Sequence, residues 1–173
     1  MKKISLFTFL SAALILNYSA LTYADTLQIP IKGTTRDSKI SGVATFAETT
    51  EGLKVSVEIT GAPSGKHGLH IHENGSCDDQ GMAAGSHFNP DKVPHGLLAK
   101  DGVEHAHAGD LGNIEISPEG TGKYEATLPH LKLQDKKYGV EGRAIVLHEK
   151  EDDFGQPTGN AGGRIGCGVI LQN

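Results

Sequence analysis

The segment around His70-Ile71-His72 alternates apolar and metal-binding side chains along the chain. Side chains on a β-strand project alternately to its two faces, so both imidazoles would lie on one face and Leu69 and Ile71 on the other. The apolar face can be buried against a core, whereas two histidines placed together are unusual for packing alone. The pattern therefore predicts a β-strand that carries part of a metal site.

Other segments have the same period of two. The clearest lies at 53–60, where Leu53, Val55, Val57 and Ile59 alternate with polar residues. Gly-rich turns separate the predicted strands, and no amphipathic helix of useful length is found. A proline at position 30 indicates an edge strand. The pattern predicts an all-β fold, an eight-stranded antiparallel Greek-key barrel or sandwich. Its strands are expected near 27–32, 40–46, 53–60, 111–116, 123–128, 143–148 and 165–171, in addition to the one that carries His70 and His72.

Two long segments, 73–110 and 149–164, show no period of two or of 3.6 residues. Both are polar and rich in glycine, and the first has few β-branched residues. Long loops without secondary structure are usually functional or disordered. The first loop contains several histidines and a cysteine, so we expect metal ions and a disulfide to hold it in place.

The first 24 residues have the features of a secretory signal peptide. Lys2 and Lys3 precede an apolar run over 4–16, and Thr22-Tyr23-Ala24 supplies a cleavage site before Asp25. The apolar run is too short to span a bilayer. The expected mature protein is a single domain over 25–173, exported and most simply placed in a periplasm.

The charge of the chain excludes some partners. Removal of 1–24 takes away two lysines and no acidic residue, which changes the net charge from −5 to −7. An acidic chain without a basic cluster argues against nucleic acid or an anionic membrane as a partner. Whether two copies pair as a homodimer stays open.

Cys77 and Cys167 are the two cysteines of the chain. In an oxidising compartment they most simply form one disulfide, and two separate buried thiols are the less favoured alternative. A bridge across this span would contribute about 4 to 5 kcal/mol in the chain-entropy view of disulfides.

Nine histidines in so short a chain favour a metal site over isolated core or surface histidines. Imidazole suits zinc and copper, and an added carboxylate suits zinc. Several motifs together resemble Cu,Zn superoxide dismutase of the exported bacterial kind: His70-x-His72-Glu73, Gly85–Pro90, His95-Gly96, His107–Asn113, Val146–Lys150 and Gly159–Ile170.

The resemblance implies dismutation of superoxide to dioxygen and hydrogen peroxide by a redox-cycling copper, with a structural zinc that shares a bridging histidine. One copper and one zinc would be bound per subunit, and the enzyme would protect the cell envelope. The resemblance assigns copper to His70, His72, His87 and His148, and zinc to His87, His95, His107 and Asp110. It also assigns the bridging and proton-carrying role to His87, anion guidance to Arg164, a hydrogen bond to one histidine of each metal to Asp152, and the disulfide to Cys77 and Cys167.

Alternatives remain at several positions. Arg164 is otherwise an ordinary surface ion-pairing residue, and Asp152 part of a solvated acidic run. His105 competes with His107 for zinc, although the spacing to Asp110 favours His107. His67 faces away from the copper side by parity, and His130 has no assigned role. Lys132, Lys136 and Lys137 would help to attract an anion if they folded toward the copper.

Two other functions share the His-x-His pattern. An enzyme of the cupin or α-carbonic anhydrase type would need one open metal and no bridging histidine. An exported metal carrier would bind metal without dismutation.

Overall fold

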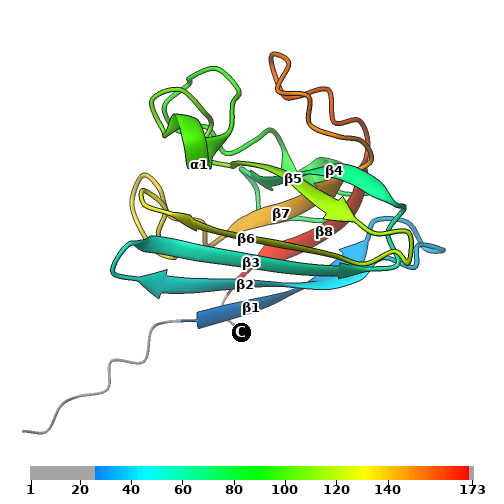
Figure 1. Ribbon diagram of the computed structural model, residues 1–173. Coiled ribbons are helices and arrows are strands. Elements are labelled where there is room, and N and C mark those ends of the chain that lie inside the picture. The colour runs from blue at the N-terminus through cyan, green and yellow to red at the C-terminus, as the bar shows by residue number, and fades with distance from the viewer. Residues whose placement is uncertain (1–25, 172–173) are drawn as a thin grey trace, which may run out of the picture.

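Residues 26–171 are described by a computed structural model, and the predicted signal peptide at 1–24 lies outside them. Over this range the chain forms a closed antiparallel barrel in the order β1-β2-β3-β6-β5-β4-β7-β8 (Figure 1). The all-β Greek-key prediction is confirmed. The strands are β1 (Thr26–Gly33), β2 (Ser41–Thr49), β3 (Gly52–Thr60), β4 (Gly65–His72), β5 (Asp110–Ile116), β6 (Gly122–Leu128), β7 (Arg143–His148) and β8 (Arg164–Ile170).

Side chains along β3 alternate between buried and more exposed positions, as the sequence predicts. Leu53, Val55 and Val57 are fully buried in the core, whereas Glu58 and Thr60 of the same strand are exposed. Burial of each such side chain contributes about 1.5–3 kcal/mol, so a register slip of one residue would be strongly disfavoured.

The edge-strand prediction for Pro30 is wrong in part, because β1 pairs with both β2 and β8 and the barrel closes. Its pairing with β8 is limited to Lys32 and Gly33, however. Pro30 therefore lies outside the ladder that closes the barrel, where its missing N–H breaks no bond to β8.

Strand β7 is buried on both faces. Ile145 and Leu147 belong to the barrel core, whereas Val146 packs outside it with Ala84 and Cys167 in a second apolar cluster. The loop between β4 and β5 therefore folds back over the outer face of β7.

Both long loops rise from the same side of the barrel in Figure 1. The first holds a 3-10 helix, η1 (Met82–Ala84), and a short helix, α1 (Leu98–Asp101). Main-chain bonds from Ile71 N to Gly109 O and from Phe88 N to Ile71 O, each 2.9 Å, fix this loop to the end of β4. A Cβ at Gly109 would come within 2.1 Å of Ile71 O, so only glycine fits there.

The predicted disulfide is confirmed. Cys77 and Cys167 are joined with an S–S distance of 2.04 Å, which ties the first loop to β8. No helix among residues 26–171 is long and apolar enough to cross a membrane.

Candidate metal centre

Three histidines from two paired strands meet above the barrel. His70 and His72 lie on one face of β4, and His148 ends the neighbouring β7. The Nε2 atoms of His72 and His148 are 3.2 Å apart. Each strand has a register irregularity next to its histidine, between Leu69 and His70 in β4 and just before His148 in β7. Such bulges re-aim side chains beside functional sites.

His87 reaches these histidines from the first loop. It forms an isolated bridge with His72, and its ring centroid lies 4.1 Å from that of His70 and 4.9 Å from that of His72. All four side chains are buried. We call them the four-histidine group: His70, His72, His87 and His148.

Asp110, the first residue of β5, is the centre of a second group. Its Oδ1 lies 2.8 Å from His87 Nδ1 and 3.1 Å from His107 Nδ1, and its Oδ2 lies 2.8 Å from His95 Nδ1. The main-chain N–H groups of Gly96 and His107 also donate to Oδ2, at 3.0 Å. We call this set the Asp110 group: His87, His95, His107 and Asp110.

The fully buried Asp152 connects the two groups. His70 Nε2 donates to its Oδ2 at 2.8 Å, and His95 Nε2 donates to its Oδ1 at 2.9 Å. A carboxylate only accepts hydrogen bonds when ionised, so each imidazole carries a proton on Nε2, and its Nδ1 faces the four-histidine group or the Asp110 group.

The surroundings of these two Nδ1 atoms show whether metal ions fit the site. His70 Nδ1 and His95 Nδ1 are both buried without a hydrogen-bond partner. His95 Nδ1 is close to Asp110 Oδ2, yet the contact lacks hydrogen-bond geometry. Unsatisfied buried nitrogen is costly, and a bound cation would remove the cost at both positions. The donor set therefore fits two metal ions.

Burial keeps most of the four-histidine group neutral, which is the form that binds metal. It lowers the pKa of His72 to about 2, that of His148 to about 3 and that of His87 to about 4. His95 behaves differently: burial opposes its charge, but contacts with Asp110 and Asp152 raise its pKa to about 9.

The two carboxylates have the opposite shift. Burial alone would raise the pKa of Asp110 and of Asp152, but hydrogen bonds from the surrounding histidines hold both well below the usual range. Both side chains are therefore ionised at neutral pH, the form in which a carboxylate can bind a cation or accept hydrogen bonds from histidines.

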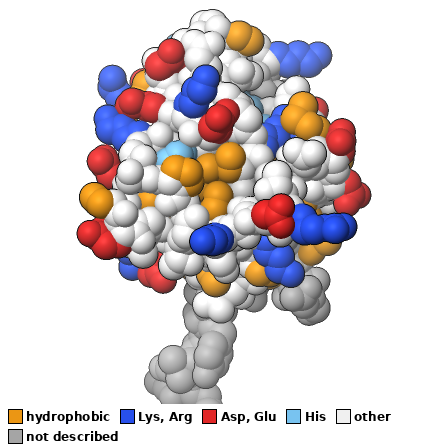
Figure 2. All heavy atoms as spheres, turned by 90° about the vertical axis from the view of Figure 1, so that its right-hand side faces the viewer, with side chains coloured by type: hydrophobic (Ala, Val, Ile, Leu, Met, Phe, Trp, Pro, Cys, Tyr) orange, Lys and Arg blue, Asp and Glu red, His pale blue; other side chains and the backbone are white. Residues whose placement is uncertain are grey.

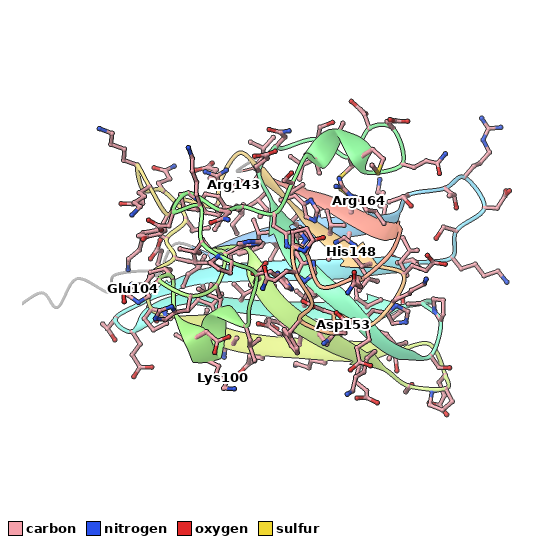
Figure 3. All side chains as sticks on the ribbon, turned by 90° about the horizontal axis from the view of Figure 1, so that it is seen from above. Lys100, Glu104, Arg143, His148, Asp153 and Arg164 are labelled. Carbon is pink, nitrogen blue, oxygen red and sulfur yellow. A yellow bond between two sulfur atoms is a disulfide. The ribbon has the colours of Figure 1, made fainter. Side chains whose placement is uncertain are left out.

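A cavity of about 260 Å³ opens from the four-histidine group to the surface. Arg164 is the one cation among the described residues that line it. Its Nη1 donates to the carbonyls of Gly81 and Met82, and its Nη2 donates to Gly85 O at 2.6 Å. Figure 3 shows Arg164 and His148 close together, with Lys100 and Glu104 on the other side of the molecule.

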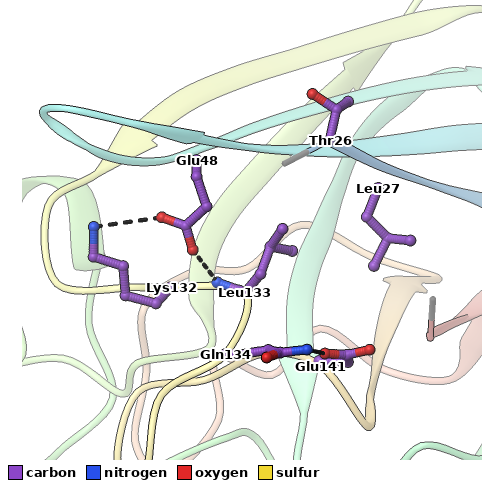
Figure 4. Close-up of a pocket in the computed structure, with 7 residues that line it drawn as sticks. All are labelled: Thr26, Leu27, Glu48, Lys132, Leu133, Gln134 and Glu141. Carbon is purple, nitrogen blue, oxygen red and sulfur yellow. Dashed lines mark hydrogen bonds and ion pairs between the residues drawn. The ribbon is translucent and has the colours of Figure 1, made fainter. Parts of the chain in front are cut away.

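The lysines considered for anion attraction do not line this cavity. Lys132 pairs with Glu48 at 3.4 Å beside a separate cavity of about 530 Å³ (Figure 4), and Lys137 pairs with Asp91. The segment that carries them packs against β2 instead, where Leu133 N donates to Glu48 Oε1 at 2.6 Å.

The remaining histidines stay outside both groups. His67 is buried, with Nδ1 2.9 Å from His148 O and Nε2 3.0 Å from Pro63 O, so it joins β4 to the end of β7. His105 is exposed, whereas His107 is buried in the Asp110 group. His130 is exposed near Tyr138, with ring centroids 6.4 Å apart.

Two carboxamide side chains bind main-chain groups of Asp152 and His95. The sequence analysis assigned neither of them a role. Asn113 donates to Asp152 O at 2.9 Å and accepts from Asp152 N at 2.8 Å. Gln156 accepts from His95 N at 3.0 Å and donates to His95 O at 2.8 Å. Asn113 is the last residue of the motif His107–Asn113, so the sequence could have indicated a role for it. No sequence pattern indicated a role for Gln156.

The outer surface carries mixed charge. In Figure 2, acidic and basic side chains are interspersed around a small apolar area, without a large patch of one sign on that face.

Comparison with known proteins gives a consistent result. The family model for copper/zinc superoxide dismutase (SODC) matches residues 40–170. An extracellular Cu-Zn superoxide dismutase of Drosophila melanogaster is 41% identical over 145 residues, which are 78% of this chain and 77% of the relative. A Cu-Zn superoxide dismutase of Deinococcus radiodurans is 40% identical over 144 residues, 76% of this chain and 78% of the relative.

A solved structure shares the fold. The clock protein EA4 superimposes with a TM-score of 0.74 at 34% identity, covering 89% of this chain and 99% of that protein.

Proposed function

The chain belongs to the copper/zinc superoxide dismutase family, and from this premise we propose that it dismutates superoxide at a copper ion that shares His87 with a structural zinc ion. The observation that carries the proposal is the membership of His87 in both side-chain groups. An imidazole has two ring nitrogens, so one side chain can serve two ions.

The four-histidine group suits copper. Imidazole nitrogens are good copper ligands, and four of them leave room for a small ligand on the side of the cavity. The Asp110 group suits zinc, because three histidines and one carboxylate complete a closed tetrahedral set. When bound, copper supplies the one-electron redox chemistry that oxidises one superoxide to dioxygen and reduces another to hydrogen peroxide.

His87 has the geometry to handle a proton. Its Nδ1 lies 2.8 Å from Asp110 Oδ1 and is committed to the Asp110 group, which leaves Nε2 for the four-histidine group. Hydrogen peroxide carries two protons that superoxide lacks, and we assign delivery of one of them to His87 Nε2. Asp152 positions His70 and His95 and so keeps the two groups in one fixed arrangement.

Arg164 would attract and orient the substrate anion. Its guanidinium is always charged, and three main-chain carbonyls hold it at the edge of the cavity. The second loop also exposes the acidic residues Glu149, Glu151 and Asp153, which do not attract an anion. The attraction therefore depends mainly on Arg164.

We further propose export. The relatives from Drosophila melanogaster and Caenorhabditis elegans are named extracellular, and the disulfide is typical of oxidising compartments. On this view, residues 1–24 are the removed signal peptide, 25–173 the mature domain, and the enzyme protects the cell envelope from a periplasmic position.

Metal analysis tests the proposal. The purified protein, loaded with both metals, should contain one copper and one zinc per chain, with a visible copper band that bleaches on reduction. A single zinc without copper would instead favour a one-metal enzyme, and both metals without dismutation would favour a metal carrier.

A further inference from the structure

Met82 occupies the outer edge of the metal cavity. It is the one methionine of the chain after residue 1, and 59% of its surface is exposed. It lines the same cavity as His72, His87 and His148, three members of the four-histidine group. An exposed apolar side chain at the entrance to a buried metal site needs an explanation beyond packing.

The main chain at Met82 is firmly held. Met82 N donates to Asp79 O at 2.9 Å, and Met82 O accepts from Gly85 N and from Arg164 Nη1. Two residues on, Ala84 is buried in the apolar cluster beside Cys167, which the disulfide joins to the same loop. The segment is anchored from below, while its thioether stays at the entrance.

The chemistry of the thioether selects one ion. Sulfur of this kind is a soft, neutral ligand that binds Cu(I) and has little affinity for zinc, calcium or magnesium. A carboxylate in its place would pair with Arg164 and repel an anionic substrate, whereas a thioether does neither.

The depth of the histidines creates a need for such a ligand. His72 is 1% exposed and His148 is 6% exposed, so the two histidines offer little surface to an ion that arrives from bulk water. We propose that Met82 captures Cu(I) at the mouth of the cavity and passes it by ligand exchange to His72 and His148. The proposal rests on the copper site of the proposed function, and no redox change is involved.

A loading experiment tests this. Zinc-loaded, copper-free mature protein is mixed without oxygen with Cu(I) held in a coloured chelate, and the loss of colour gives the rate of transfer. In Met82→Leu, which keeps the apolar volume, transfer should be slower by about tenfold or more, with the same final copper and zinc content. Transfer at the wild-type rate would overturn the proposal.

A matched control distinguishes the position of the thioether from its mere presence in the protein. Val43 on β2 is 43% exposed and is not among the residues that line the cavity. The double variant Met82→Leu, Val43→Met restores one exposed thioether elsewhere and should load as slowly as Met82→Leu; recovery of the rate would count against a placed ligand. In wild-type protein labelled with 13C at the methionine methyl group, Cu(I) should shift the single Met82 signal during loading, and a constant signal would contradict capture.

Failure of the wider proposal would look different. If the four-histidine group does not hold copper, the wild-type protein itself will finish without one equivalent of copper. Equal melting temperatures of the zinc-loaded variants will show that slower loading is not a folding defect.

Discussion

Asn113 holds the main chain of Asp152 with both ends of its carboxamide, at 2.9 Å to the carbonyl oxygen and 2.8 Å from the amide nitrogen. Asn113 belongs to β5 and Asp152 to the loop after β7, so one side chain fixes the loop to the barrel. Because Asp152 in turn orients His70 and His95, this pair sets the position of one histidine in each metal group.

We expect Asn113→Ala to release copper and zinc about 10–100-fold faster, as is usual when a partner of a metal ligand is lost. Release is measured with a coloured chelator. The exchangeable Nε2 proton signals of His70 and His95 should also shift, because their bonds to Asp152 are disturbed. Gln134→Ala is the control: it also removes a carboxamide, but one that donates to Glu141 at 2.7 Å and belongs to neither metal group. Similar release from both variants would contradict a specific role for Asn113.

Arg164→Ala should lower the second-order rate with superoxide by about tenfold or more and weaken its dependence on ionic strength. The reason is that no other described residue lining the cavity is cationic. Lys123→Gln is the matched control, since it removes the same charge from an exposed ion pair with Glu58 on the barrel wall. An unchanged rate in Arg164→Ala would refute steering by this residue.

Reduction of Cys77–Cys167, or removal of the metals, should loosen residues 73–110 before the barrel unfolds. This segment places only a few side chains, such as Phe88 and Leu98, in the barrel core, and the disulfide and the Asp110 group fix much of the rest. Hydrogen exchange followed by mass spectrometry should show early loss of protection there and retained protection in β3. Equal protection with and without metal and disulfide would contradict the prediction.

The metal-free protein should be most stable near pH 6.5. Below that pH, the unfolded chain binds protons at His72, His87 and His148, whose folded-state pKa values of about 2, 4 and 3 keep them neutral, so stability falls with falling pH. Above it, folded His95 retains a proton up to its pKa of about 9 while the unfolded chain has lost it, so stability falls with rising pH. Urea unfolding at about pH 5, 6.5 and 9 measures this. A rise in stability from pH 6.5 to pH 5 would contradict it.

Sequence patterns predicted the barrel because its strands alternate visibly. The period of two in β3 reports directly which side chains are buried, whereas in His70-Ile71-His72 it separates the core face from the histidine face, and both of these faces are buried. The positions that came from the family resemblance, such as His95 in the first loop and Asp110 at the start of β5, follow a segment without periodicity, where local patterns carry no information on contacts.

The rest depended on tertiary contacts. Gln156 reaches the main chain of His95 across 61 residues of sequence, and Met82 reaches the cavity only because the loop folds over β7. The lysine group was expected near the metals only if its segment folded that way. That segment packs against Glu48 instead, an arrangement that charge patterns alone do not show.

The central claim is a paired metal centre that shares His87 and dismutates superoxide. The most direct test is the decay of a pulse of superoxide, followed by its ultraviolet absorbance, in the presence of protein loaded with one copper and one zinc per chain. The account predicts that substoichiometric loaded protein removes the whole pulse within many turnovers, whereas the metal-free protein has no effect. Removal of no more than one superoxide per bound copper would contradict it.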